Sequence, residues 1–210
     1  MQKIENIILD YGNVIFMIDF EKSQHAFSQL GIENAGEIFA HHGQIELFDN
    51  FDKGLISSAE FRDGIRALAG KPELTDTQID EAWNALLIGV PQGKHELLLQ
   101  LKERYRTFLL SNNNPIHYAR CMQQIKEEYG VEDNTPFFEK TYYSHLMGMR
   151  KPDPEIFEYV LQQHNLNPQH TVFIDDSPQH LRTAQQLGLK VELCTRERPL
   201  EVIVKELALI

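Results

Sequence analysis

This sequence has only two cysteines, fewer basic than acidic residues, and no long apolar run. Cys121 and Cys194 lie far apart, in segments expected to be a helix and a strand end, so we expect no disulfide framework. Twenty basic against 31 acidic residues give a net charge of −11. This charge disfavours nucleic acid and anionic membranes as partners. No stretch is long enough to span a bilayer, and the first residues lack the basic region of a signal peptide, so a cytoplasmic location is expected.

Several motifs that carry chemistry are also missing. Without a Gly-x-Ser-x-Gly elbow or a Gly-x-Gly-x-x-Gly turn, the sequence predicts neither a serine hydrolase nucleophile nor a dinucleotide site. No two of the nine histidines are spaced i, i+4, and His41 and His42 are neighbours in an expected helix, so no zinc site is predicted. Residues 89–95 superficially resemble a phosphate-binding loop, but the spacing is one residue short, and we interpret 89–93 as a hinge.

What the sequence does contain is a set of short apolar runs that each end in polar residues. The three clearest are Ile7–Leu9 before Asp10, Phe108–Leu110 before Ser111, and Val172–Ile174 before Asp175. Runs that are apolar on both faces are typical of parallel strands covered by helices. A weaker fourth strand is expected at 190–194. Asn114, Asp153 and Ser177 each precede a proline and predict helix starts. This alternation predicts an α/β fold with a doubly wound parallel sheet.

The interval 17–88 interrupts this alternation, because it has helical periodicity and no convincing strand. Thr75 is expected to cap a helix that carries Ile79, Ala82, Trp83, Leu86 and Leu87. Phe61, Ile65 and Leu68 form a second apolar stripe. With 210 residues the chain is long enough for one core and a small additional lobe. We therefore predict an α/β core formed by 1–16 and 89–210, with an inserted helical cap at 17–88.

Polar residues that follow the predicted strands are candidates for a site. Asp10 and Ser111 each have an ordinary interpretation, as a turn residue and as part of an N-capping loop, and Lys151 alone could simply be solvated. Asp175 and Asp176 are more specific, since adjacent carboxylates repel each other unless a cation or donors compensate. Right-handed crossovers would bring this pair to the same edge of the sheet as Asp10 and Ser111. Oxygen ligands of this kind suit Mg²⁺.

The order of Asp10, Ser111, Lys151 and the pair Asp175–Asp176 resembles the four sequence motifs of the haloacid dehalogenase (HAD) superfamily. The helical insertion stands where that family places its type I cap. Residues 9–14, 110–112 and 148–152 are similar to the bacterial subgroup that includes an α-D-glucose-1-phosphate phosphatase. The resemblance covers essentially the whole chain and implies a Rossmann-like HAD core and a Mg²⁺-dependent phosphoric monoester hydrolase.

The resemblance also implies a role for each site residue. Asp10 would attack phosphorus and form an aspartyl-phosphate, which water then hydrolyses. The implied magnesium ligands are the Asp10 side chain, the Gly12 backbone carbonyl, Asp175 and Asp176, the last directly or through water. The implied phosphoryl-binding groups are Ser111, the Asn112 backbone N–H and Lys151, which is also expected to be catalytic.

Gly12 departs from the pattern of the superfamily, because most of its phosphatases carry a second Asp two residues after the nucleophile as general acid and base. Loss of a positioned acid typically lowers the rate by about 10²–10⁴-fold. The metal ligand is retained, since it is a backbone carbonyl. At Gly12 we also expect a backbone that favours φ > 0, which would make an Asp at this position costly.

The expected substrate is a small phosphate ester, with sugar phosphates preferred. One alternative is a metal-independent haloacid dehalogenase, although the pair Asp175–Asp176 would then have no function. A second alternative is a phosphometabolite-binding module that lost catalysis with the acid. The sequence predicts neither the physiological ester nor an oligomeric state.

Overall fold

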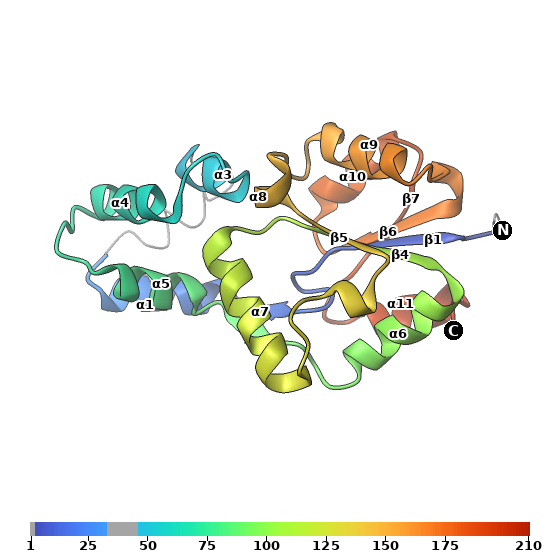
Figure 1. Cartoon of the computed structure of the whole chain (residues 1–210), viewed down its shortest axis with the longest axis horizontal. Coiled ribbons are helices and arrows are strands. Elements are labelled where there is room, and N and C mark those ends of the chain that lie inside the picture. The colour runs from blue at the N-terminus through green and yellow to red at the C-terminus, as the bar shows by residue number, and fades with distance from the viewer. Residues whose placement is uncertain (1–2, 33–45) are drawn as a thin grey trace.

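The computed structural model describes residues 3–32 and 46–210, which form a parallel sheet between two layers of helices and a helical unit at one end (Figure 1). The strands are β1 (Asn6–Leu9), β2 (Met17–Ile18), β3 (Leu87–Gly89), β4 (Arg106–Ser111), β5 (Lys140–Tyr143), β6 (Thr171–Asp175) and β7 (Lys190–Leu193). The helical unit consists of α1 (Phe20–Gln29), α3 (Glu46–Asp52), α4 (Ser58–Ala69) and α5 (Asp76–Asn84). The remaining helices are α6 (Lys94–Arg104), α7 (Pro115–Tyr129), α8 (Ser144–Met147), α9 (Pro154–Gln163), α10 (Pro178–Gln186) and α11 (Leu200–Glu206). His41 and His42 lie outside the described residues, and no helix in the described part has the length and apolar character needed to cross a membrane.

The main sheet has the strand order β5-β4-β1-β6-β7, and all neighbouring strands are parallel. The chain starts at the central strand β1, builds one side with β4 and β5, and then crosses to build the other side with β6 and β7. The carboxyl ends of β4, β1 and β6 therefore meet where the order reverses, which is where open α/β sheets bind ligands. The predicted doubly wound fold is confirmed.

Three strands differ from the sequence prediction. β5 was not predicted, because this edge strand has no continuous apolar run: Lys140 is exposed, and only Tyr142 and Tyr143 are buried. β2 and β3 pair antiparallel at the two ends of the interval 17–88, so this interval is not purely helical. With two and three residues, these strands are too short to produce a recognisable pattern.

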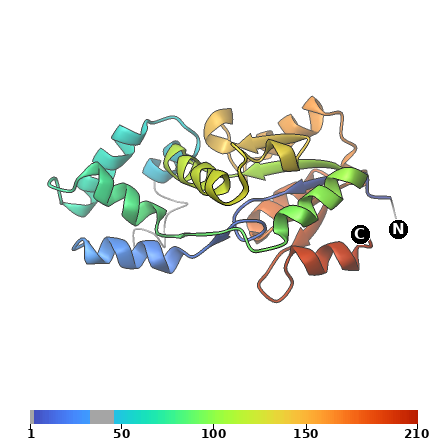
Figure 2. The same cartoon turned by 60° about the horizontal axis from the view of Figure 1, so that its bottom comes forward.

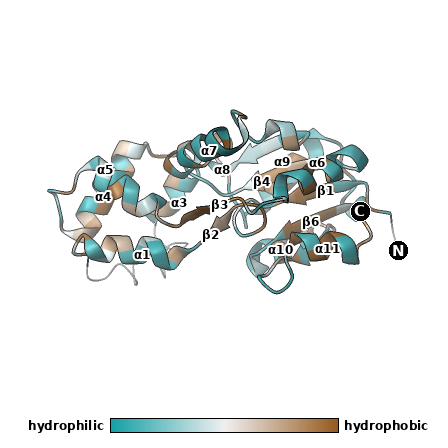
Figure 3. Ribbon diagram, turned by 90° about the horizontal axis from the view of Figure 1, so that it is seen from below, coloured by the Kyte–Doolittle hydropathy of each residue, from teal (hydrophilic) through white to brown (hydrophobic). Residues whose placement is uncertain are grey.

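The sheet buries a separate apolar cluster on each face. Along β1, Ile7 and Leu9 pack toward α6, α7 and α11, whereas Ile8 packs toward α9 and α10. Figure 2 gives a second view of these helices, and Figure 3 shows hydrophobic residues along β1 and β6, between helices that carry both hydrophilic and hydrophobic residues. Full burial of each such side chain contributes about 1.5–3 kcal/mol. This burial holds β1 rigidly, and its carboxyl end with it.

The helical unit has its own apolar cluster, dominated by aromatic side chains. The rings of Phe51 and Phe61 stack with centroids 4.1 Å apart. Ile116 of α7 belongs to the same cluster and joins the unit to the sheet. Three residues of the predicted stripes differ. Leu68 is exposed, and Leu86 and Leu87 both lie beyond the end of α5 at Asn84, Leu86 in a turn and Leu87 in β3.

The predicted helix starts are confirmed. Asn114, Asp153 and Ser177 are the N-cap residues of α7, α9 and α10, each with proline in the first turn, and Thr75 caps α5. Of the three proline-linked caps, only Asn114 accepts a hydrogen bond through its side chain, from the N–H of His117. The loops after β4 and β6 thus turn directly into helices, which keeps their residues at the sheet edge.

Candidate active site

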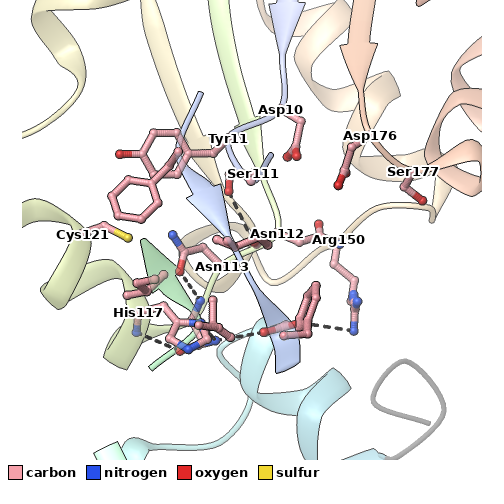
Figure 4. Close-up of a pocket in the computed structure, with 18 of the residues that line it drawn as sticks. Asp10, Tyr11, Ser111, Asn112, Asn113, His117, Cys121, Arg150, Asp176 and Ser177 are labelled. Carbon is pink, nitrogen blue, oxygen red and sulfur yellow. Dashed lines mark hydrogen bonds and ion pairs between the residues drawn. The ribbon is translucent and has the colours of Figure 1, made fainter. Parts of the chain in front are cut away.

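Three predicted site residues lie side by side at the ends of adjacent strands. Asp10 follows β1, while Ser111 and Asp175 are the last residues of β4 and β6, and all three are buried. The N–H of Asp10 donates to the carbonyl of Ile174 at 2.9 Å, so the pairing of β1 with β6 fixes Asp10 beside Asp175. Figure 4 shows the carboxylate of Asp10 between the hydroxyl of Ser111 and the carboxylate of Asp176.

Lys151 is fully buried between two of these carboxylates. Its Nζ lies 2.6 Å from Oδ1 of Asp10 and 2.7 Å from Oδ2 of Asp175. Burial opposes the charge of the ammonium group, but the two carboxylates outweigh it and raise the pKa of Lys151 above its usual value. A buried cation without such partners would be strongly destabilising. Lys151 is therefore charged and held at the centre of the cluster.

The side chain of Asn112 holds the backbone of Lys151 in place. Its Nδ2 donates to the Lys151 carbonyl at 2.7 Å, and its Oδ1 accepts from the Lys151 N–H at 2.9 Å. The family resemblance implied only a backbone role for Asn112. This side-chain function was missed because the two residues are far apart in the sequence and meet only through the fold.

Asp10, Asp175 and Asp176 offer carboxylate oxygens that all lie within 4.8 Å of one another. Three carboxylates and Lys151 leave two net negative charges, which a divalent cation would balance. Hard oxygen ligands are those that Mg²⁺ prefers. The described residues therefore fit the predicted metal.

The carboxyl groups of this cluster differ in acidity. Burial raises the pKa of Asp10 to about 7, and the charges of Asp175 and Asp176 act in the same direction, against Lys151. Burial also opposes ionisation of Asp175, but Lys151 and His180 overcome it and lower its pKa to about 2. A cation that stabilised the ionised form of Asp10 would therefore bind in competition with a proton.

Asn13, rather than Gly12, has the left-handed backbone at this turn. Asn13 has φ +54°, and Gly12 lies outside the positive-φ region, so the expected conformational constraint at Gly12 is wrong. The side chain of Asn13 donates to Oδ2 of Asp176 at 3.0 Å and accepts from the N–H of Ile18 at 3.1 Å. Asn13 was missed, although Asn is the residue that most readily accepts this conformation after Gly.

His180 is a second residue that the sequence analysis missed. Its Nδ1 lies 3.0 Å from both carboxylate oxygens of Asp175, which also accepts from the N–H of Ser177 at 2.7 Å. Its position in the sequence could have indicated this contact, because His180 lies in the first turn of the helix that directly follows Asp175 and Asp176.

A cavity of about 330 Å³ extends from the carboxylate cluster toward the helical unit. Its apolar wall is formed by Phe16, Ile18, Phe20, Trp83, Leu86 and Leu87. Its polar residues away from the strand ends are Asp52, Asn113, Asn114, His117 and Arg150. A concave apolar site with a few converging polar groups suits a small molecule.

Comparison with known proteins places the chain among relatives of similar architecture. A family model described as haloacid dehalogenase-like hydrolase matches residues 4–188. The D-ribitol-5-phosphate phosphatase of Bacteroides thetaiotaomicron is 32% identical over 188 residues, which cover 89% of this chain and 90% of that protein.

Solved structures agree with this. A HAD family enzyme of Bacteroides thetaiotaomicron, solved in complex with magnesium and inorganic phosphate, is 40% identical with a TM-score of 0.80, covering 91% of this chain and 94% of that one. A HAD-like hydrolase of Porphyromonas gingivalis is 30% identical with a TM-score of 0.87, covering 98% of both chains. L-2-haloacid dehalogenase of Xanthobacter autotrophicus shares the fold. It is 19% identical with a TM-score of 0.60, and the match covers 98% of this chain and 82% of that one.

The chain belongs to the haloacid dehalogenase-like hydrolase family. The resemblance found in the sequence is confirmed, and so is the expected enzyme class, a phosphatase of this family. The roles of the individual site residues remain predictions.

Proposed function

We propose that this protein is a Mg²⁺-dependent phosphatase that hydrolyses small phosphate monoesters, sugar phosphates among them, through an aspartyl-phosphate on Asp10. The observation that carries the proposal is the convergence of Asp10, Asp175, Asp176 and Lys151 at one sheet edge, with their carboxylate oxygens within 4.8 Å of one another. Three acids and a lysine are more than a structural turn requires. The relative solved with magnesium and phosphate supports the same chemistry.

Asp10 is the proposed nucleophile. One carboxylate oxygen attacks phosphorus, the bond to the ester oxygen breaks, and the leaving alkoxide takes a proton to become the alcohol. Water then attacks the phosphorus of the acyl phosphate, the bond from phosphorus to the Asp10 oxygen breaks, and inorganic phosphate and the free carboxylate are formed. Asp10 faces the cavity from the end of a strand that is buried on both faces, so little reorganisation is needed to present it.

The proposed magnesium ligands are the Asp10 side chain, the Gly12 backbone carbonyl, Asp175 and Asp176. When bound, the ion would neutralise negative charge that the substrate phosphate and Asp10 bring together. Asn13 orients Asp176, while Ser177 and His180 orient Asp175, so these ligands have supporting hydrogen bonds.

Ser111, the Asn112 backbone N–H and Lys151 are proposed to bind the phosphoryl oxygens. The hydroxyl of Ser111 makes a long hydrogen bond of 3.3 Å to the carbonyl of Asn112, which it can exchange for a phosphate oxygen. Lys151 supplies positive charge from a fixed position, since Asn112 holds its backbone. Charge at a preorganised position is an effective means of stabilising a phosphoryl transition state.

The division into a core of 1–16 and 89–210 and a cap of 17–88 is part of this proposal. Its support is that the helical unit has its own apolar cluster and lines one side of the cavity. A cap of this kind leaves room only for a compact ester, and the relative that acts on D-ribitol 5-phosphate agrees with a sugar-like substrate. A cytoplasmic location remains a prediction from the sequence.

The test is hydrolysis of 4-nitrophenyl phosphate by the purified protein with Mg²⁺, compared with the variant Asp10→Asn. Turnover should require Mg²⁺, stop on addition of chelator, and be lost in the variant, because the amide cannot attack phosphorus. Asp63→Asn, at an exposed position of α4, is the control and should keep full activity. Activity that survives in Asp10→Asn would overturn the mechanism.

Two further measurements on the same protein separate the alternatives. A metal-independent dehalogenase would release halide from a 2-haloacid in the presence of chelator. A lapsed binding module would bind phosphate without hydrolysing any ester.

A further inference from the structure

The end of the cavity farthest from the strand ends is lined by polar groups from both the sheet domain and the helical unit. Asp52, the last residue of α3, faces Arg150 there, and Asn114 and His117 come from the start of α7. Figure 4 shows Arg150 extending away from Asp10 and Asp176 toward the helical unit, where a dashed line marks its contact. These residues would surround the leaving group of a bound phosphate ester.

The charge of Arg150 is already balanced. Its Nη1 lies 3.1 Å from Oδ1 of Asp49 and 3.5 Å from Oδ2 of Asp52, and its side chain is only 12% exposed. Lys53 completes the group, since it pairs with both Asp49 and Asp153. The carboxylates of Asp49, Asp52 and Asp153 outnumber the two cations, Arg150 and Lys53, so the group has no net positive charge for a ligand.

A second anionic group on the substrate would therefore meet no net positive charge here, and Nε of Arg150, which has no hydrogen-bond partner, is buried. Among the described residues that line the cavity, Arg150 is the only Lys or Arg, whereas Asp10, Asp52 and Asp176 are acidic. Residues 17–88 contain 13 acidic and five basic residues, so they carry a charge of −8 out of the total of −11. An extra carboxylate or phosphate would be desolvated beside Asp52 without compensation, which is strongly unfavourable.

Neutral hydroxyl groups fit the same environment well. Asp52 is 6% exposed, and its carboxylate accepts a hydrogen bond from Asn114 at 3.3 Å and forms an ion pair with Arg150 at 3.5 Å. A carboxylate has about four acceptor sites, so Asp52 keeps acceptor capacity for hydroxyl donors. Phe20, Trp83 and Leu86 offer an apolar wall for the carbon chain that carries those hydroxyls.

We infer that the leaving group is an uncharged polyhydroxy alcohol, that esters with a second anionic group are rejected, and that Asp52 and the Arg150–Asp49 ion pair determine this specificity. This inference rests on the proposed phosphatase function and narrows its substrate class to polyol and sugar monophosphates with a single anionic centre.

The experiment compares kcat/KM for ribitol 5-phosphate and 5-phosphoribonate, which differ only by a terminal hydroxymethyl or carboxylate group. The wild-type protein should prefer ribitol 5-phosphate by about tenfold or more, because the carboxylate would be buried unpaired. Asp49→Asn frees Arg150 to pair with the substrate carboxylate, so the preference should fall by about tenfold. Asp153→Asn is the matched control. It also removes one negative charge that pairs with Lys53, but it leaves the pair of Arg150 with Asp49 intact, so the preference for ribitol 5-phosphate should stay that of the wild type.

A second variant gives an answer that does not depend on how well Asp49→Asn folds. Asp52→Asn removes the carboxylate that repels the second anion and accepts the substrate hydroxyl, so kcat/KM should fall for ribitol 5-phosphate and rise for 5-phosphoribonate. Equal kcat/KM values for the two esters, or an equal change in Asp49→Asn and Asp153→Asn, would overturn the inference. Hydrolysis of 4-nitrophenyl phosphate tests the proposed phosphatase function separately. If this ester is hydrolysed but the two five-carbon esters are not distinguished, only the inference about specificity fails. If no ester is hydrolysed, the proposed function and the inference both fail.

Discussion

Nζ of Lys151 lies 2.7 Å from Oδ2 of Asp175, and both side chains are fully buried. The two residues come from different segments, the loop before α9 and the end of β6. Breaking such a buried pair by removing one partner typically costs about 3–5 kcal/mol, because the other charge is left buried and uncompensated. The pair thus makes the stability of the sheet edge depend on the residues proposed for catalysis.

Asp175→Asn should therefore change both metal affinity and stability. We expect a higher Mg²⁺ requirement, partly rescued by excess Mg²⁺, because one anionic ligand is lost. The free energy of unfolding should fall by about 2 kcal/mol, less than for a fully orphaned charge, since Asp10 still pairs with Lys151. Metal titration of the rate and chemical denaturation measure the two effects. If excess Mg²⁺ fails to rescue a correctly folded variant, Asp175 has another role.

Two substitutions of Asn13 distinguish the effect of its left-handed backbone conformation from the effect of its side-chain hydrogen bonds. Asn13→Gly keeps the left-handed backbone but removes the hydrogen bonds to Asp176 and from the N–H of Ile18, so Mg²⁺ affinity should fall about tenfold and stability by about 1 kcal/mol. Asn13→Ala should lose the same affinity and about 1 kcal/mol more stability than Asn13→Gly, because a Cβ disfavours φ +54°. Identical melting curves for the two variants would contradict the conformational part of this explanation.

Gly12 leaves the departing oxygen without the usual acid, so kcat should depend on leaving-group acidity. Glucose 1-phosphate expels a more acidic hydroxyl than its isomer glucose 6-phosphate and should turn over faster. Gly12→Asp should reduce this difference, and Gly12→Asn, of the same shape but without the acid, should not. A Cβ at Gly12 would lie 3.2 Å from the end of the Ile18 side chain and 3.9 Å from Oδ2 of Asp10, so a small shift of Ile18 accommodates both variants. Equal kcat values in the wild type, with chemistry shown to be rate-limiting, would indicate that another residue supplies the proton.

His95 lies in the core with no hydrogen-bond partner for either ring nitrogen among the described residues. Its ring stacks on Phe137 with centroids 4.2 Å apart, and burial lowers its pKa below the usual 6.5. His95→Phe should raise the free energy of unfolding by about 1 kcal/mol at pH 8, since two orphaned polar atoms are removed.

The difference in the free energy of unfolding between His95→Phe and the wild type should increase as the pH is lowered. Above pH 6.5, His95 is neutral in both the folded and the unfolded wild-type chain. As the pH falls below 6.5, the unfolded chain binds a proton at His95 that the folded chain resists, so the free energy of unfolding of the wild type falls. Denaturation curves at several pH values measure this trend, and His25→Phe, at an exposed position of α1, is the control. An equal effect of both substitutions would rule out the explanation from burial.

The sequence was sufficient for the parts of this protein that depend on local pattern. Apolar runs such as Ile7–Leu9 identified the central strands, because a strand covered on both faces must be apolar throughout. Asn114 and Thr75 identified helix starts, because an N-cap side chain acts within three residues of its own position. The order of Asp10, Ser111, Lys151 and the pair Asp175–Asp176 was enough to recognise the family, which the comparisons confirmed.

Only the tertiary structure decided which side chains support those residues and how charge is distributed around the cavity. The bond from Asn112 to Lys151 and the contact of Arg150 with Asp49 join residues 39 and 101 positions apart. No periodicity records such pairs, because each depends on how separate elements pack. Arg150 has the same charge in the sequence whether it is paired or free, and burial beside Asp49 determines that it is paired. Chemical type is fixed by the sequence, whereas the availability of a charge or hydrogen bond to a ligand depends on neighbours that only the folded chain provides.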